Sequence, residues 1–232
     1  MAIKNEQSVE VEVLNQSEAF FNKHKKVILG VICALIVIIA GTILYKAYYA
    51  GPREEKASTA LGKGQEYFMN DMFDKALNGD GAGYQGFIKL TSDFSGTDAA
   101  NLANLYAGLS FVNLKKWNDA IKYLEAYSPS DDSMISPAAT AALGNAYAHI
   151  NQLDKAVSNL KKAASMADDA TKDGTNNSIS ASFLLQAGKI LESQNRNEEA
   201  LKIYQNIKDK YVNCVIVQSQ EIDKYIERTS NK

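Results

Sequence analysis

The chain has 232 residues, 46% of them hydrophobic, so it is long enough and apolar enough to bury a sizeable core. Its net charge of −2 gives no basic footprint for nucleic acid, and we expect no nucleic-acid partner. The two cysteines, Cys33 and Cys214, stand far apart in the sequence and predict no disulfide framework.

An apolar segment at residues 27–46 follows an N-terminal tail at residues 1–26. The run VILGVICALIVIIAGTILY, from Val27 to Tyr45, carries no charge across 19 residues. A helix rises about 1.5 Å per residue, so this run nearly matches a hydrocarbon core of about 30 Å. A cleavable signal peptide has a shorter apolar region of about 7–15 residues and a small-residue cleavage site, whereas AYYAGP is a poor one. The segment therefore predicts a single, uncleaved transmembrane helix.

The charged residues on either side of this segment favour one orientation. Lys23, Lys25 and Lys26 crowd the N-terminal flank, whereas the basic residues on the other side are spread out as far as Lys56. Because basic residues tend to stay on the cytoplasmic side, the pattern favours a cytoplasmic tail and an exported C-terminal domain. The expected location is the inner membrane, with one span and the domain at 47–232 in the periplasm.

A repeated phrase follows the apolar segment. Four glycines each precede an alanine by twelve residues, and a large residue stands three positions after each glycine. The pairs are Gly64 and Ala76, Gly108 and Ala120, Gly144 and Ala156, and Gly188 and Ala200. In the last three copies Leu124, Leu160 and Tyr204 come four residues after the alanine. A fixed internal interval of this kind predicts a helical repeat in which small residues let paired helices approach closely.

These segments resemble the tetratricopeptide repeat. The runs LYAGLSFVNLKKWNDAIKYL, LGNAYAHINQLDKAVSNLKKA and LQAGKILESQNRNEEALKIYQNI carry the resemblance, although the usual tryptophan and closing proline are missing. The resemblance implies an all-α solenoid of tetratricopeptide type. With the apolar segment, the expected fold is all-α, with one N-terminal transmembrane helix followed by that solenoid. We expect repeats at about 54–95, 101–134, 137–170 and 181–213, and a capping helix at 215–229. The segment NGDGAG (Asn78–Gly83) is predicted to interrupt the first repeat as an inserted loop.

Motifs that would carry catalysis are missing from the sequence. His24 and His149 are its two histidines, no C-x-x-C pair occurs, and Gly62-Lys63-Gly64 is too short for a phosphate-binding loop. NGDG lacks the spacing of a calcium loop and is interpreted as a turn. We therefore expect a protein that is not an enzyme, with no cofactor and no metal.

What remains is a surface formed by the first helix of each pair. Helical register predicts a protein-binding groove lined by Leu105, Leu109, Ala141, Asn145, His149, Leu185 and Lys189. These small and apolar residues suit an apolar or helical segment of a partner protein. Part of the set, the leucines above all, could instead belong to the core.

The whole layout is similar to the YfgM-type family of ancillary Sec translocon subunits, which share a short tail, one anchor and a small exported repeat domain. It also resembles a tetratricopeptide family of Bacteroidota, through ALNGDGAGYQGF and NLANLYAG. The first resemblance implies a scaffold whose partners are the Sec translocon and a membrane-anchored periplasmic chaperone. The alternatives are a scaffold in another envelope assembly such as outer-membrane biogenesis or cell division, a cytoplasmic-facing adaptor if the topology is reversed, and an accessory subunit of an enzyme with a ligand pocket.

Overall fold

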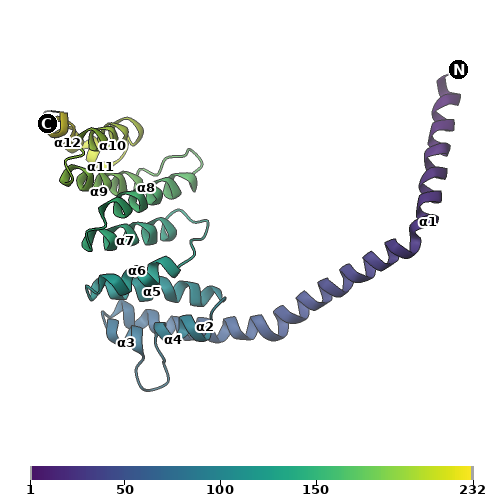
Figure 1. The fold of residues 1–232 in the computed structure, drawn as a ribbon, viewed down its shortest axis with the longest axis horizontal. Coiled ribbons are helices and arrows are strands. Elements are labelled where there is room, and N and C mark those ends of the chain that lie inside the picture. Colours follow the sequence, from purple (N-terminus) through teal and green to yellow (C-terminus); the bar gives the residue numbers. More distant parts are fainter. Residues whose placement is uncertain (1, 231–232) are drawn as a thin grey trace. The chain divides into compact units, whose positions relative to one another are not determined.

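The structure is a computed structural model that describes residues 2–230, with side-chain surroundings from residue 23 onward. Residue 1 of the predicted tail and residues 231–232 of the predicted repeat domain lie outside the described residues. Every regular element between residues 2 and 230 is a helix and none is a strand (Figure 1). This confirms the all-α prediction. The chain divides into two compact units, residues 1–53 and 54–232.

The first unit is helical throughout its described residues. It contains α1 (Ala2–Tyr45), the π-helix η1 (Lys46–Ala50) and the first residues of α2 (Gly51–Met69). The apolar run from Val27 to Tyr45 belongs to α1, and none of it is buried. By length and composition this helix could cross a membrane, and a signal sequence would have the same properties.

The second unit is a series of helix pairs. The first pair is α2 with α3 (Phe73–Asn78) and α4 (Phe87–Asp93), the second is α5 (Asp98–Asn113) with α6 (Trp117–Ala126), the third is α7 (Ile135–His149) with α8 (Leu153–Asp169), and the fourth is α9 (Ser180–Ser193) with α10 (Asn197–Lys210). The short α11 (Val215–Gln218) and α12 (Glu221–Ser230) follow. From α5 to α10 each helix packs against the next one in the chain, and α12 packs on α10 (Figure 1). This neighbour-on-neighbour packing is a helical-repeat solenoid, as predicted.

The repeated glycine and alanine lie where the two helices of a pair meet. Ala76, Ala120, Ala156 and Ala200 are all fully buried. A side chain added at Gly108, Gly144 or Gly188 would meet Leu124, Leu160 or Tyr204 of the second helix. The small residues therefore allow the close approach of the helices, and the large residue one turn after the alanine fills the space beside the glycine.

Each pair turns at a residue in the left-handed conformation, five positions before the buried alanine. These residues are Asp71, Lys115, Asn151 and Asn195, with φ between 57° and 60°. The amide of the following residue bonds to a carbonyl five residues earlier, as in Gln152 N to Tyr147 O at 2.9 Å. This is the Schellman arrangement that closes a helix, and it recurs here without glycine at the left-handed position. Asparagine tolerates that conformation best among these residues, whereas Lys115 adopts it at some cost.

The first pair departs from the others because its second helix is split. The loop between α3 and α4 has positive φ at Gly79 and Gly86, where a side chain would collide with the backbone of Tyr84 and of Leu77. The residue four positions after Ala76 is Asp80, which lies in this loop. The space beside Gly64 is instead filled by Tyr84, which directly follows the inserted loop, and by Phe87 of α4.

The first two pairs are joined through the start of α5. The Glu54 carboxylate on α2 accepts hydrogen bonds from Asp98 N at 2.8 Å and Ala99 N at 2.9 Å, and the Thr97 hydroxyl accepts from Ala100 N. These contacts satisfy amides that have no partner within α5, and they place a negative charge at the positive end of its dipole.

Candidate protein-binding face

Matched positions on the first helices define a solvent-accessible stripe, here called the first-helix face. Relative to the glycine of each pair these positions are −6, +1 and +5, and all of them are exposed or half-buried. The residues are Ser58, Gln65 and Met69 on α2, Leu102, Leu109 and Asn113 on α5, Ala138, Asn145 and His149 on α7, and Ser182, Lys189 and Ser193 on α9.

The predicted groove residues differ in how far they reach solvent. Leu105 and Ala141 are buried, with 5% and 3% of their surface exposed, and Leu105 forms a cluster with Leu124, Tyr127 and Ala139. Leu109 packs half-buried against that cluster, and Leu185 is also half-buried. Asn145, His149 and Lys189 are exposed. Leu105 and Ala141 therefore support the face from beneath, and Leu109, Asn145, His149 and Lys189 lie on it. Leu185 has the same register as Leu105 and Ala141 and lies half-buried beside the face.

Two of the exposed groove residues contact aromatic rings, and the sequence analysis predicted neither contact. The His149 imidazole stacks on the Trp117 indole of the preceding pair, with ring centroids 3.8 Å apart and planes within 4°. The Lys189 ammonium lies 5.0 Å from the centroid of the Tyr225 ring on α12. LKKWND reads as a turn in the sequence, and only the folding of α6 against α7 brings Trp117 to this end of the face.

The first-helix face is nearly free of charge. Lys189 is the one residue at its twelve positions that carries a charge at neutral pH, with histidine taken as neutral. The exposed positions of α8, by contrast, include Asp154, Lys155, Lys161, Lys162 and Asp169. Charged side chains resist the loss of water, so an uncharged face costs less to bury against a partner than the α8 surface does.

The face ends at a pocket between α9 and α11. This pocket has a volume of about 410 Å³, and its lining includes Ala181, Ser182 and Leu185 of α9, Val215 and Ile216 of α11, and Glu221 of α12. Val215 is 83% exposed and stands at its rim. One turn further along α9, Lys189 and Glu192 border a second, more open hollow against Tyr225 and Arg228. There the Arg228 guanidinium donates two hydrogen bonds of 2.7 Å to the Glu192 carboxylate.

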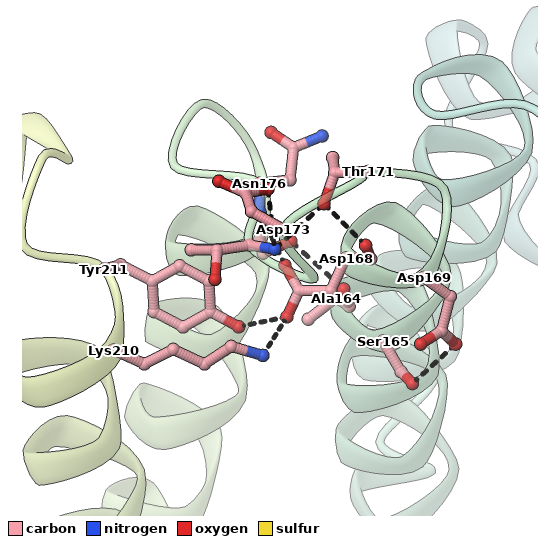
Figure 2. Close-up of polar contacts among 11 residues, drawn as sticks. Ala164, Ser165, Asp168, Asp169, Thr171, Asp173, Asn176, Lys210 and Tyr211 are labelled. Carbon is pink, nitrogen blue, oxygen red and sulfur yellow. Dashed lines mark hydrogen bonds and ion pairs between the residues drawn. The ribbon is translucent and has the colours of Figure 1, made fainter.

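A polar cluster around Asp168 holds the loop between the third and fourth pairs (Figure 2). The buried carboxylate accepts hydrogen bonds from Lys210 Nζ and Tyr211 Oη, both at 2.6 Å, and from Asn176 N at 2.8 Å. Burial raises the pKa of Asp168, but these hydrogen bonds outweigh it and hold the pKa below the ordinary 3.8. Burial and the bond to Asp168 raise the pKa of Tyr211. The contacts drawn in Figure 2 tie Asp168 to Lys210, Tyr211 and Asn176, so the cluster fixes the loop that follows α8.

A second carboxylate organises the inserted loop of the first pair. Asp80 accepts from Lys63 Nζ at 2.7 Å, from Tyr67 Oη at 2.8 Å, and from the amides of Ala82 and Tyr84. The bonds from Lys63 and Ala82 lower the pKa of Asp80 despite its partial desolvation. These hydrogen bonds fix the conformation of the loop, which is a turn, as the sequence predicted. No group of three or more His, Cys, Asp or Glu able to hold a metal occurs among the described residues.

Comparisons with known proteins agree with this fold. The family model described as "Tetratricopeptide repeat-like domain" matches residues 18–218. No curated protein matches the chain in sequence. Among solved structures the chain is similar to a Podosopora anserina protein with nearly identical TPR-like repeats, assigned as a kinesin light chain. The identity is 10%, the match covers 77% of this chain and 94% of that one, and the TM-score is 0.48.

Proposed function

This chain belongs to the tetratricopeptide repeat-like domain family, and we propose that it is a membrane-anchored scaffold for protein–protein interaction in the bacterial envelope. The observation that carries the proposal is the uncharged first-helix face, in a family whose repeats bind other proteins. The finer proposal is an ancillary subunit of the Sec translocon that holds a membrane-anchored periplasmic chaperone. It is supported by the resemblance of the tail, anchor and repeat domain to the YfgM-type family.

The anchor in this proposal is residues 27–46, with residues 1–26 in the cytoplasm and the repeat domain from residue 47 in the periplasm. Its support is the charge-free run of 19 residues and the tight cluster of Lys23, Lys25 and Lys26 before it. An alkaline phosphatase fused after Lys232 should be active, and a cytoplasmic reporter at the same place should be inactive. The reverse result would make the protein a cytoplasmic-facing adaptor, and a shortened mature chain would identify the apolar run as a signal sequence.

The binding surface in this proposal is the first-helix face. Leu109, Asn145, His149, Leu185 and Lys189 would contact the partner, with Leu105 and Ala141 as the packing beneath. The half-buried leucines offer apolar contact, and Asn145 offers both a donor and an acceptor for hydrogen bonds near the centre of the face. Binding energy tends to concentrate in a few such central residues.

Site-specific photo-crosslinking in living cells tests the partner. A photoreactive amino acid at Asn145 should crosslink to a Sec translocon subunit or to the periplasmic chaperone. The same group at Lys162, which is exposed on α8, is the matched control. Crosslinks from Asn145 to a component of outer-membrane biogenesis or of cell division would favour the alternative envelope scaffold. Equal crosslinking from both positions would remove the first-helix face as the binding surface.

A further inference from the structure

The pocket at the C-terminal end of the first-helix face suggests the chemistry of the segment that binds there. Ser182 belongs to both the face and the pocket, and Leu185 lies beside it on α9, so a partner lying along the face would reach the pocket at its end. A volume of about 410 Å³ accommodates more than one apolar side chain and falls in the range of ordinary ligand sites. The pocket is therefore an anchor point of that face rather than a separate surface.

The lining combines apolar side chains, four uncharged polar residues (Asn177, Ser178, Ser182 and Asn213) and a single charge. Leu185, Val215 and Ile216 supply the apolar contact, and Val215 is 83% exposed although it is a β-branched aliphatic residue. Glu221 is the one charged residue of the lining, and it is exposed at the first turn of α12. Its Oε1 atom accepts from Tyr225 Oη over a long distance of 3.4 Å, which leaves the carboxylate close to solvent.

The three basic residues of α9 and α12, Lys189, Lys224 and Arg228, are all outside the pocket lining, and two of them are engaged elsewhere. Lys189 lies over the Tyr225 ring, and Arg228 is bonded to Glu192, both in the neighbouring hollow. Neither lines the pocket. An approaching cation would meet the Glu221 carboxylate beside an apolar surface, whereas an approaching anion would be repelled.

We propose that this pocket receives apolar side chains of a partner segment that carries a lysine or arginine next to them, with the cation pairing with Glu221. The proposal rests on the proposed function, because it names the kind of segment that the scaffold binds. Buried aliphatic contact provides most of the affinity, and the carboxylate selects the sign of the flanking charge.

The test uses the full chain in detergent micelles and two synthetic peptides of twelve residues. The peptides are identical except that lysine or glutamate stands beside a pair of leucines. We expect the lysine peptide to bind about threefold more tightly, the size of effect that one partly exposed ion pair supports. Fluorescence anisotropy of labelled peptides measures both affinities.

Three variants make the result specific to the pocket. Glu221→Lys should reverse the preference, so that the glutamate peptide binds more tightly. Glu198→Lys makes the same charge change in the first turn of α10, outside the pocket lining, and should leave the preference unchanged. Val215→Ser should weaken both peptides without changing their order, and because Val215 is mostly exposed the fold should survive.

Equal binding of the two peptides, no binding of either, or a preference that Glu221→Lys leaves intact would overturn the proposal. Crosslinking from Asn145 distinguishes a failure of the pocket proposal from a failure of the proposed scaffold function. If that position still captures an envelope protein while the peptides show no charge preference, the scaffold function stands and the assignment of the pocket falls.

Discussion

In the third helix pair, Leu160 of α8 fills the space beside Gly144 of α7, whereas in the first pair the space beside Gly64 is filled by Tyr84 and Phe87. A side chain at Gly144 would lie 3.1 Å from Leu160 Cγ and from the Ala156 carbonyl oxygen, closer than most side-chain contacts, while one at Gly64 would overlap the Tyr84 hydroxyl and the Phe87 ring. The same close approach of two helices is therefore achieved by aliphatic packing in one pair and by aromatic packing from residues that follow an insertion in the other.

The largest effect is expected from removing the residues that fill these spaces. Phe87→Ala should destabilise the solenoid by about 3–5 kcal/mol, because the ring is fully buried and stacks on Tyr106 at 5.6 Å between centroids. Leu160→Ala, also fully buried, should cost about 2–5 kcal/mol. Urea unfolding of the full chain in micelles, followed by the fluorescence of its single tryptophan, Trp117, measures both.

If the first pair were a loosely attached element, Phe87→Ala would split the unfolding into two steps and leave the Trp117 transition in place. A single shifted transition would show that the aromatic packing belongs to the same cooperative unit as the third pair.

The glycines distinguish the two pairs more directly. Gly64→Ala should destabilise by about 1–3 kcal/mol, since the new methyl group must displace an aromatic ring. Gly144→Ala should change stability by less than about 1 kcal/mol, because the gain in helix propensity offsets a mild crowding. Equal losses in the two variants would contradict the idea that the first pair is packed more tightly at this position.

The glycine–alanine interval in the sequence was sufficient to predict the all-helical solenoid and the close approach of two helices at the glycine and alanine positions. The packing of Leu124, Leu160 and Tyr204 beside the glycines emerged only from the structure. The filling of the first pair was not predictable, because its large residues lie beyond an insertion that breaks the spacing. Helical register also misplaced part of the face. Leu105 and Ala141 are one turn before the half-buried Leu109 and the exposed Asn145, and a 3.6-residue period does not settle which of two adjacent turns meets the neighbouring pair.

The polar clusters were beyond sequence reasoning for a different reason. Asp168 bonds to Lys210 and Tyr211, more than 40 residues away, and no local pattern links them. The stacking of Trp117 on His149 is a similar contact between pairs. Such contacts form only when the solenoid is assembled. A sequence pattern can predict a contact between two side chains only when both lie close together on one helix.

The third pair depends on a buried carboxylate where it meets the fourth, which gives the next prediction. Asp168→Asn should destabilise by about 1–3 kcal/mol, because Lys210 loses its charged partner and the buried Tyr211 hydroxyl loses a strong acceptor. Urea unfolding followed by Trp117 fluorescence at neutral pH measures this loss.

The same carboxylate gives the effect a pH dependence. The folded pKa of Asp168 is depressed, so its contribution is complete above the unfolded pKa near 4 and is lost as the pH falls through the folded value. Asp132, whose pKa is about 2, acts in the same direction at the start of α7. Wild type and Asp168→Asn should therefore converge in stability as the pH falls below 4. A difference that stays constant as the pH falls from 7 to the acid limit of the fold would mean that the loss comes from altered packing rather than from the ionised carboxylate.

The smallest effect on stability is expected at the exposed surface. There the first and third pairs can be compared in their contribution to partner binding. Asn145 of the third pair and Gln65 of the first occupy the same register position, one residue after the glycine. Asn145→Ala should change the unfolding midpoint little, since the side chain is exposed, yet it should lower partner capture about tenfold if it is a central contact. Gln65→Ala is the matched control at the end of the face and should lower capture less.

Quantitative pulldown of the crosslinked partner, with Trp117 unfolding on the same preparations, measures both quantities. Equal capture by the two variants and wild type would move the binding surface away from the first helices. A fall in capture that follows a fall in stability would instead assign Asn145 to the packing of the third pair.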